Sequence, residues 1–338
     1  MITVIVPVRN EAAGIKGVLL SLLRQDYPAD AFEVIVVDGM SDDGTPAIVR
    51  RMLNDHRNLR LFDNPKRLSS AARNVGVVNS AGDYLVVVDG HCTIGDRRYL
   101  HNLERAFVES GADTLGRPQP LNVDHATAFQ KCLARARQSK LGHNPDSAIF
   151  SDEAKFVEPQ NVAVAYRRRV FDVVGLFDER FDACEDVEFN FRVHQAGMTC
   201  YFTPTIGVSY HPRSSLGGLV YQMIRYGRGR SRLAQKHPQS LTLPAVVPAA
   251  WLVWLAVAFA VGLFVPYVST AFCASLVLYL AVVAAVSAAL AFRGPPGSAV
   301  FLPLIFVGIH VGFGWGMLRE TAAFFRRATR LQTRSASE

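Results

Sequence analysis

Apolar residues follow two different rhythms along the first ninety positions. Some form short continuous runs, typical of strands buried on both faces of a sheet. These runs predict strands at 3–8, 32–38, 59–63 and 83–89. Others recur three and four positions apart, as on one face of a helix. They predict helices at 11–25, 43–53 and 68–81. The alternation predicts an α/β fold with a mainly parallel sheet and helices on both faces.

Two acidic residues stand at the ends of predicted strands. Asp38 closes the second strand and Asp89 closes the fourth. Ligands of parallel sheets bind beyond the carboxyl ends of the strands, so we expect both side chains to face one crevice.

The middle of the chain is less regular. Residues 141–157 are loop-like, and 161–181 predict a strand, a short helix and a turn. Helices are expected at 97–110, 124–140 and 185–197, the last ending at Gly197, a favoured C-terminal cap.

The charge pattern changes in the last third. After Glu188 no acidic residue occurs before Glu320, and residues 213–240 carry five arginines and one lysine. An almost wholly apolar segment follows directly. This order predicts basic juxtamembrane helices that contact anionic lipid, although a solvated basic face would also fit.

Three apolar stretches each reach the ~20 residues that cross a bilayer. They lie at 243–265, 269–292 and 299–318. The predicted organisation is therefore a cytosolic domain at 1–212, a basic segment at 213–240, transmembrane helices within 241–320 and a basic tail at 321–338. The basic segment favours the cytosolic side for the first domain. Three crossings would then place the basic tail outside, against the positive-inside tendency. Two alternatives stay open: one segment is re-entrant, or the short tail tolerates the unfavoured side.

Composition narrows the partners. The formal charge of +7 suits nucleic acid, an anionic membrane or phosphorylated substrates. No nucleic-acid motif is present, and the basic residues precede a membrane segment, so we expect no nucleic acid. The five cysteines are scattered without a C-x-x-C pair, which argues against a disulfide framework or structural zinc. The oligomeric state is left open.

Four motifs occur in a characteristic order through the first two thirds of the chain. They are VIVPVRNEAAGI, VIVVDGMSDDGT, ARNVGVVNSAGDYLVVVDG and EDVEFNFRVHQAG. This series resembles the family 2 glycosyltransferases, which have the GT-A fold. DGHC and YGRGRSR are similar to the succinoglycan-biosynthesis ExoA-like branch, with a cytosolic transferase domain and a short membrane tail. The resemblance implies sugar transfer from a nucleotide sugar with Mg²⁺ or Mn²⁺.

The resemblance also implies a nucleotide pocket. Asp38 matches the aspartate that accepts hydrogen bonds from the base or ribose. Turn and helix-capping chemistry is the alternative for each of these residues. The other matching positions, which include two possible phosphate contacts at 67 and 73, are Pro7, Arg9, Asn10, Glu11, Arg67 and Arg73.

Asp89 matches the first carboxylate of the family's Asp-X-Asp motif. A cation bridging it to the donor diphosphate would neutralise the charge of the leaving group. His91 stands where the second carboxylate is usual. Histidine suits Mn²⁺ better than Mg²⁺. His91 could also donate directly to a phosphate, and a plain turn is the simplest alternative.

Asp186 matches the family's general base, which removes the acceptor hydroxyl's proton during inverting transfer. Glu185 beside it could add a second contact. Alternatively, the two acids merely favour the start of a helix through its dipole.

Acceptor-side positions are the least distinctive. Gln160 and Asn161 align with an acceptor segment. QMIRY resembles the Q-x-x-R-W motif of processive members, with Tyr226 in place of tryptophan, and this puts processive synthesis in doubt. The candidate acceptor or phosphate contacts there are Gln222, Arg225, Tyr226, Arg228 and Arg230.

The sequence thus predicts a membrane-bound inverting transferase. It would move one sugar, with a UDP-sugar as the preferred donor, to a polyprenyl-(di)phosphate acceptor at the cytoplasmic membrane face, for exopolysaccharide or another glycoconjugate. The alternatives are a polyprenyl-phosphate sugar synthase, a processive polysaccharide synthase and an inactive GT-A membrane scaffold.

Overall fold

The computed structural model describes the backbone of residues 1–142 and 148–335, and their side chains except those of Asn161 and residues 328–335. The chain forms two compact units. One consists of Met1–Asn122 and Asp146–His211, and the other of Val123–Pro145 and Pro212–Glu338. The segment at 123–145 therefore groups with the C-terminal helices, although it interrupts the first unit in the sequence.

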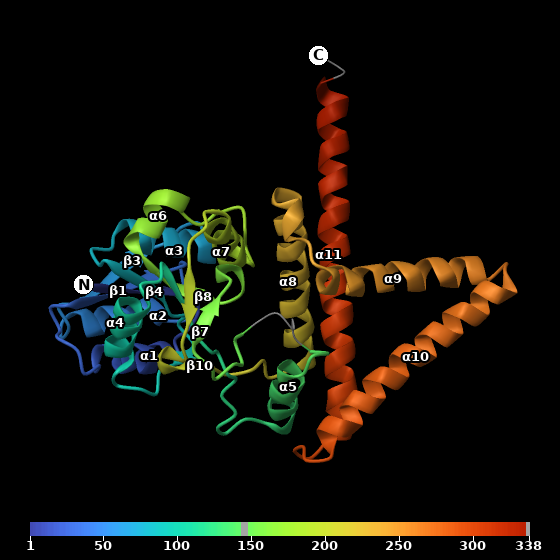
Figure 1. Cartoon of the computed structure of the whole chain (residues 1–338), viewed down its shortest axis with the longest axis horizontal. Coiled ribbons are helices and arrows are strands. Elements are labelled where there is room, and N and C mark those ends of the chain that lie inside the picture. The colour runs from blue at the N-terminus through green and yellow to red at the C-terminus, as the bar shows by residue number, and fades with distance from the viewer. Residues whose placement is uncertain (143–147, 336–338) are drawn as a thin grey trace. The chain divides into compact units, whose positions relative to one another are not determined.

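Half of the main sheet is parallel (Figure 1). Its strands lie in the order β3-β2-β1-β4, with Val8, Asp38 and Asp63 side by side at the carboxyl ends of the first three. The strands with continuous apolar runs are confirmed at or near the predicted bounds: β1 Ile2–Val8, β2 Phe32–Asp38, β3 Leu59–Asp63 and β4 Tyr84–Val87.

The other half of the sheet is mixed. β8 pairs antiparallel with β4, and the order continues β8-β6-β9-β7. β7 falls inside the stretch expected to be a loop, of which residues 143–147 lie outside the described residues. A second sheet pairs β5 with β10. These short strands are β5 Cys92–Thr93, β6 Thr114–Gly116, β7 Lys155–Val157, β8 Ala163–Arg167, β9 Cys200–Phe202 and β10 Ser209–Tyr210.

Helices cover both faces of the main sheet. One apolar core joins alternate residues of β1 and β2 to α1, α2 and α4, and the opposite face packs on α3, α6 and α7. Continuous apolar strands are needed because both faces are buried. The helices are α1 Ile15–Leu23, α2 Thr45–Leu53, α3 Ser69–Val78, α4 Tyr99–Ser110, α6 Arg168–Val174 and α7 Glu185–Gln195. Three 3-10 turns add η1 Pro159–Asn161, η2 Pro204–Ile206 and η3 Pro238–Ser240.

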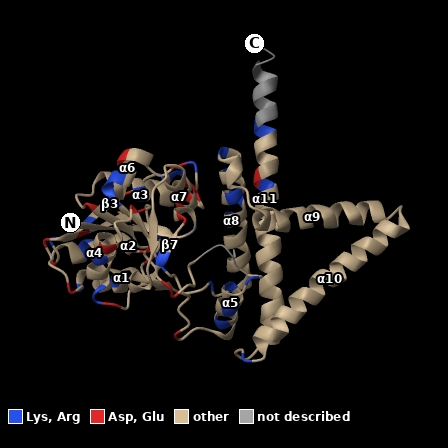
Figure 2. Cartoon of the chain, viewed as in Figure 1, with Lys and Arg blue, Asp and Glu red and all other residues tan. Residues whose placement is uncertain are grey.

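The second unit is helical throughout its named elements. Three of its helices, α9, α10 and Ser298–Arg327 of α11, are long and apolar enough to cross a membrane. Lysine and arginine gather instead on α5, on α8 and on α11 just before its grey end (Figure 2). The bounds are α5 Ala128–Gln138, α8 Leu216–Lys236, α9 Leu243–Gly262, α10 Pro266–Ala291 and α11 Ser298–Ser335. The last helix runs well past the predicted end at 318.

Candidate active site

Helix α3 organises one side of the site. The Ser70 hydroxyl donates to the Phe181 carbonyl at 2.9 Å. Asn74 donates to the Phe177 carbonyl and accepts from the Phe177 N–H, both at 2.9 Å. Residues three and four apart share one helix face, so Arg73 points toward the same loop as its two neighbours. The loop that leads into α7 is thereby fixed against the helix that carries Arg73.

Arg73 lies between two carboxylates. Its Nη2 is 3.8 Å from Asp89 Oδ1 and 3.5 Å from Glu185 Oε1, both longer than a normal hydrogen bond. Its buried Nε has no hydrogen-bond partner among the described residues. Burial alone would lower the pKa of this guanidinium, but Glu185, Asp89 and Asp186 together raise it. Arg73 thus holds a full positive charge with donors to spare.

The first turn of α7 presents the predicted base. Its N-cap, Cys184, has a left-handed φ of 61°, which turns the chain sharply into the helix. Glu185 is buried, and burial raises its pKa although Arg73 opposes the shift. Asp186 is half-buried beside it. Further along, Asn190 accepts from the Tyr166 hydroxyl at 2.8 Å, and this bond fixes α7 to β8.

The segment after β4 requires its glycine. A Cβ at Gly90 would lie 2.6 Å from Val8 Cγ1, so only glycine lets Asp89 and His91 pass this close to β1. His91 Nδ1 is 3.2 Å from Glu11 Oε1. The buried Arg117 holds the end of β4. It donates to the Val87 carbonyl at 3.0 Å and to the Tyr99 hydroxyl at 2.6 Å.

Asp38 is satisfied within its own turn. One carboxylate oxygen accepts from the Ser41 N–H at 2.9 Å and the other from its hydroxyl at 2.6 Å. The Asn10 N–H donates to the same hydroxyl at 2.8 Å, and Asn10 Oδ1 accepts from the Asp42 N–H at 3.1 Å. Asp38 is only 2% exposed, so its direct contact with a nucleotide stays a prediction.

The remaining predicted residues are more scattered. Pro7 is buried in β1, whereas Arg9 is exposed, as is Arg67, which has a left-handed φ of 58°. Gln160 donates to Glu158 at 2.6 Å. Asn161 lies in η1, and its side chain is outside the described residues.

The predicted residues of α8 belong to the second unit. Gln222 donates to the Tyr226 hydroxyl at 3.2 Å, one turn away. Arg228 Nε is 3.2 Å from Glu320 Oε2. Arg225 and Arg230 lie on the same helix, and the roles of all five residues stay predictions.

A divalent ion fits this site only as a partner of substrate phosphates. Among the described residues no three His, Cys, Asp or Glu side chains gather as a metal site. Asp89 offers one accessible carboxylate, with its side chain 39% exposed. Mg²⁺ is commonly bound by one or two carboxylates together with substrate phosphates and water, and a single carboxylate suits that arrangement.

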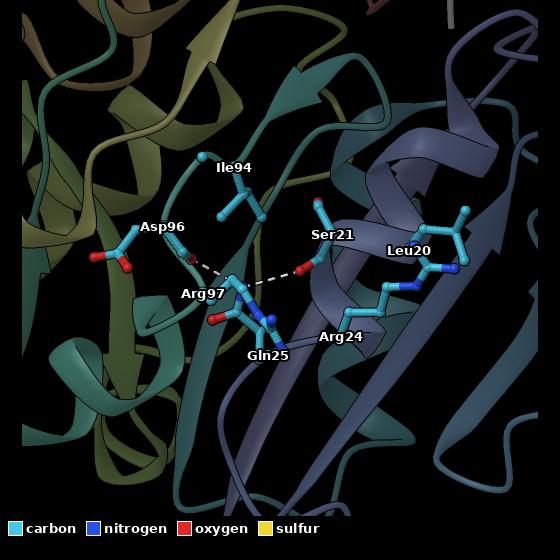
Figure 3. A pocket seen from close by; sticks show the side chains of 8 residues that line it. Leu20, Ser21, Arg24, Gln25, Ile94, Asp96 and Arg97 are labelled. Carbon is cyan, nitrogen blue, oxygen red and sulfur yellow. Dashed lines mark hydrogen bonds between the residues drawn. The ribbon is translucent and has the colours of Figure 1, made fainter.

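The sequence predicted most of these side chains, but it did not predict the residues that position them. Ser70 lies three residues before Arg73 and four before Asn74, and this helical spacing was an available signal that the three share a face. Arg117 follows a three-residue strand and carries no pattern that marks it. A pocket between α1 and the segment after β5, lined by Gln25 and Arg97 among others, contains none of the predicted residues (Figure 3).

The comparisons with known proteins agree with this architecture. The model of "Glycosyl transferase family 2" matches residues 3–139, and that of "Glycosyl transferase family group 2" matches 148–318. The chain is 32% identical to the succinoglycan biosynthesis protein ExoA of Rhizobium meliloti, over 73% of this chain and 74% of the relative.

A second relative is also a glycosyltransferase by name. It is a dolichyl N-acetyl-glucosaminyl phosphate diacetamido-dideoxy-glucuronosyltransferase of Methanococcus voltae, 25% identical over 70% of this chain and 74% of the relative.

Solved structures show the same fold. The mannosyltransferase PcManGT of Pyrobaculum calidifontis, solved with GDP-Man and Mn²⁺, has a TM-score of 0.59 at 22% identity, over 93% of this chain and 87% of that one. A fragment of S. aureus TarS, solved with UDP-GlcNAc, has a TM-score of 0.52 at 20% identity, over 69% of this chain and 66% of that one.

The fold and the ordered motifs define a GT-A glycosyltransferase, and the chain belongs to glycosyltransferase family 2. Within that family it falls in the ExoA-like branch. The fold and family predicted from sequence are confirmed.

Proposed function

We propose that the chain is an inverting glycosyltransferase that moves a single sugar from a nucleotide-diphosphate sugar to a lipid-linked acceptor. The observation that carries the proposal is the position of Arg73, buried at the carboxyl end of β4 among Asp89, Glu185 and Asp186. A buried guanidinium with unused donors beside an accessible carboxylate suits a diphosphate and its counter-ion.

The donor diphosphate would lie beyond β4, against Arg73 and Asp89. A UDP-sugar is the preferred donor. A Mg²⁺ or Mn²⁺ held by Asp89 and the phosphates would supply charge neutralisation for the leaving group. Glu11 Oε1 is 3.2 Å from His91 Nδ1, and this contact would orient the imidazole, leaving Nε2 as the nitrogen that could bind a metal or donate to a phosphate.

Asp186 would act as the general base. Its carboxylate takes the proton of the acceptor hydroxyl while that oxygen bonds to the anomeric carbon. The bond from this carbon to the phosphate oxygen breaks on the opposite face, and the nucleoside diphosphate leaves with the electron pair. The anomeric configuration is therefore inverted. Glu185, buried and 3.5 Å from Arg73 Nη2, would position the arginine rather than contact the acceptor.

The acceptor class rests on the relatives and on the second unit. The Methanococcus relative is named for transfer to a dolichyl-phosphate-linked sugar, and the Rhizobium relative is named for succinoglycan biosynthesis. We extend to this chain a polyprenyl-(di)phosphate sugar as acceptor. The apolar C-terminal helices would hold the enzyme at the cytoplasmic membrane with the first unit facing the cytosol, which raises the local concentration of a lipid acceptor.

The test uses the purified full-length chain in lipid nanodiscs. UDP- and GDP-sugars are supplied with a short polyprenyl diphosphate-sugar, first with Mg²⁺ and then with Mn²⁺. We expect acceptor-dependent release of nucleotide and a product larger by one sugar. A bare polyprenyl-phosphate sugar would indicate the synthase alternative, and a ladder of products would indicate a processive enzyme. Either outcome, or no release with any donor, would contradict the proposal.

A further inference from the structure

The three apolar helices differ in how well the protein covers them. In the most apolar stretch of α9, only 11% of the residues are buried, and the same share is buried in α10. In Ser298–Arg327 of α11 the share is 50%. The first two helices expose many large apolar side chains. Examples are Leu243, Val247, Val257, Phe259, Val277, Leu278 and Leu280. Within the part of the chain that the structure describes, protein covers little of the surface of these two helices but half of the apolar stretch of α11.

The middle of α11 packs directly on α8. Gly308, Gly312 and Gly316 recur every four residues along the contact. A Cβ at Gly316 would lie 2.1 Å from the Ile224 carbonyl oxygen, and one at Gly227 would lie 2.0 Å from the Phe313 carbonyl oxygen. The two backbones therefore touch, as in helix pairs built on small residues. Figure 1 shows α8 running alongside α11.

This α8–α11 pair carries too much charge for hydrocarbon. Glu320 is buried, with one carboxylate oxygen 3.0 Å from Arg232 Nε and 3.1 Å from Arg327 Nη2. Arg228 approaches its other oxygen, and α8 also bears Arg225 and Arg230. One arginine at a bilayer centre costs at least about 2.5–3.5 kcal/mol. The part of α11 around Glu320, where it packs on the arginines of α8, therefore does not lie in the bilayer core.

The first half of α11 is covered by another basic helix, α5. The Phe129 and Phe301 rings are 5.7 Å apart, and Arg135 donates to the Arg293 carbonyl at 3.0 Å, just before α11 begins. Helix α5 also carries Lys131 and Arg137. The start and the middle of α11 are thus held by charged helices whose chain continues into the first unit.

The same contacts fix both ends of the α9–α10 pair. Helix α9 begins shortly after α8 ends, and α10 ends at the turn that Arg135 holds. Their lengths of 20 and 26 residues each suffice for a hydrocarbon core of about 30 Å at about 1.5 Å per residue. Figure 1 shows α9 leading away from α11 and α10 returning to its start.

We propose that α9 and α10 form a hairpin that crosses the bilayer and returns, while α5, α8 and α11 lie along the surface on the side of the first unit. The lipid-facing stripe of α11 is formed by Val300, Leu304, Val311 and Trp315, each more than 40% exposed. Val311 and Trp315 also line an apolar groove with Leu252 and Val257 of α9, so this stripe is continuous with the hairpin.

Two crossings instead of three remove the conflict over the basic tail. Arg319, Arg326 and Arg327 then stay on the side of the first unit, as the positive-inside tendency requires. The occupant of the exposed apolar surface is the lipid bilayer, and the basic helices that flank it match anionic headgroups.

The test is cysteine labelling of the full chain in sealed membranes. Three exposed positions are changed one at a time in a Cys273→Ser background: Val78→Cys in the first unit, Arg326→Cys near the end of α11, and Phe264→Cys at the α9–α10 turn. A membrane-impermeant maleimide is applied to intact cells and to inside-out vesicles, with the unsubstituted background as the blank.

We expect Val78→Cys and Arg326→Cys to label from the same side and Phe264→Cys to label from the other. Labelling of Arg326→Cys from the side opposite Val78→Cys would overturn the proposal in favour of three crossings. Failure of Phe264→Cys to label from the far side would overturn the crossing hairpin. Release by alkaline carbonate as a soluble dimer would show that a second copy covers these helices, and would also overturn it.

Discussion

Arg73 and Glu320 each lie at the centre of a buried cluster of arginine and carboxylate, but the two clusters are built differently. Around Glu320, side-chain distances to three arginines are 3.0–3.2 Å. Around Arg73, the distances to Glu185 and Asp89 are 3.5 and 3.8 Å, and Nε has no partner among the described residues. The first cluster is closed and joins two helices. The second is open and keeps donors for an anion.

The completeness of pairing separates a structural ion-pair cluster, which joins helices, from a cluster that can bind an anion. A buried charge pair is neither by itself, because desolvation offsets much of its attraction. What distinguishes the Arg73 cluster is incomplete pairing beside an accessible carboxylate at the carboxyl end of a parallel strand.

The largest effect is expected at Asp186. Asp186→Asn keeps the shape of the side chain but cannot take the acceptor proton, so we expect transfer to fall about 10²- to 10⁴-fold. Donor affinity should change little. Asp172→Asn, on the exposed face of α6, is the matched control and should transfer normally. Steady-state transfer and nucleotide titration measure both, and full turnover by Asp186→Asn would remove it from the mechanism.

The closed cluster should respond through stability. Glu320→Ala leaves the arginines of α8 and α11 without their common carboxylate, and breaking a buried pair costs about 3–5 kcal/mol. We expect a lower melting temperature in detergent with unchanged nucleotide affinity. Glu109→Ala, at an exposed position on α4, should melt like the parent. Equal melting temperatures for the two variants would contradict a stabilising role for the Glu320 cluster.

Gly90 tests how tightly the open cluster is positioned. Gly90→Ala puts a Cβ 2.6 Å from Val8 Cγ1, and overpacking of this kind costs about 1–3 kcal/mol. The strain should move Asp89 and His91 and lower kcat/KM. Gly95→Ala has nothing within 4 Å of the new Cβ and serves as the control in the same segment. A Gly90→Ala enzyme with parental kcat/KM would show that this positioning is unnecessary.

The smallest effect concerns pH. Burial raises the pKa of Glu185, so the folded protein retains a proton that the unfolded chain has already lost. Its contribution to stability therefore falls as pH rises from the unfolded pKa, about 4.3, through the folded one. Glu185→Gln does not titrate, so its melting temperature relative to the parent should rise with pH. Melting curves between pH 4.5 and 8 measure this, and a relative fall with pH would contradict the assignment.

The parallel half of the sheet was predictable because continuous apolar runs mark strands buried on both faces. Strands β6 and β9 were not, because three residues are too few to show a period. Asp89 and Asp186 were found singly from their motifs. That Arg73 gathers them is a property of the packing of α3 and α7, which no spacing in the sequence specifies.

The C-terminal helices show the same limit. Length and apolarity located α9, α10 and the start of α11, but they did not separate a helix that faces lipid from one that packs on protein. The spacing of Gly308, Gly312 and Gly316 was an available signal for the contact with α8. The pairing of Glu320 with Arg228 and Arg232 joins residues about ninety positions apart, so it emerges only in the folded chain.

The role of Arg73 is tested by the nucleotide affinity of two arginine variants. Arg73→Gln removes a charged donor from the open cluster, and loss of about 1.5–3 kcal/mol predicts binding weaker by about tenfold to a hundredfold. Arg232→Gln removes a partner of Glu320 and should leave nucleotide affinity unchanged while it lowers the melting temperature. Arg73→Lys, which keeps the charge, should lie between Arg73→Gln and the parent. Equal nucleotide affinity in Arg73→Gln and the parent, with both folded, would contradict a diphosphate-binding role for Arg73.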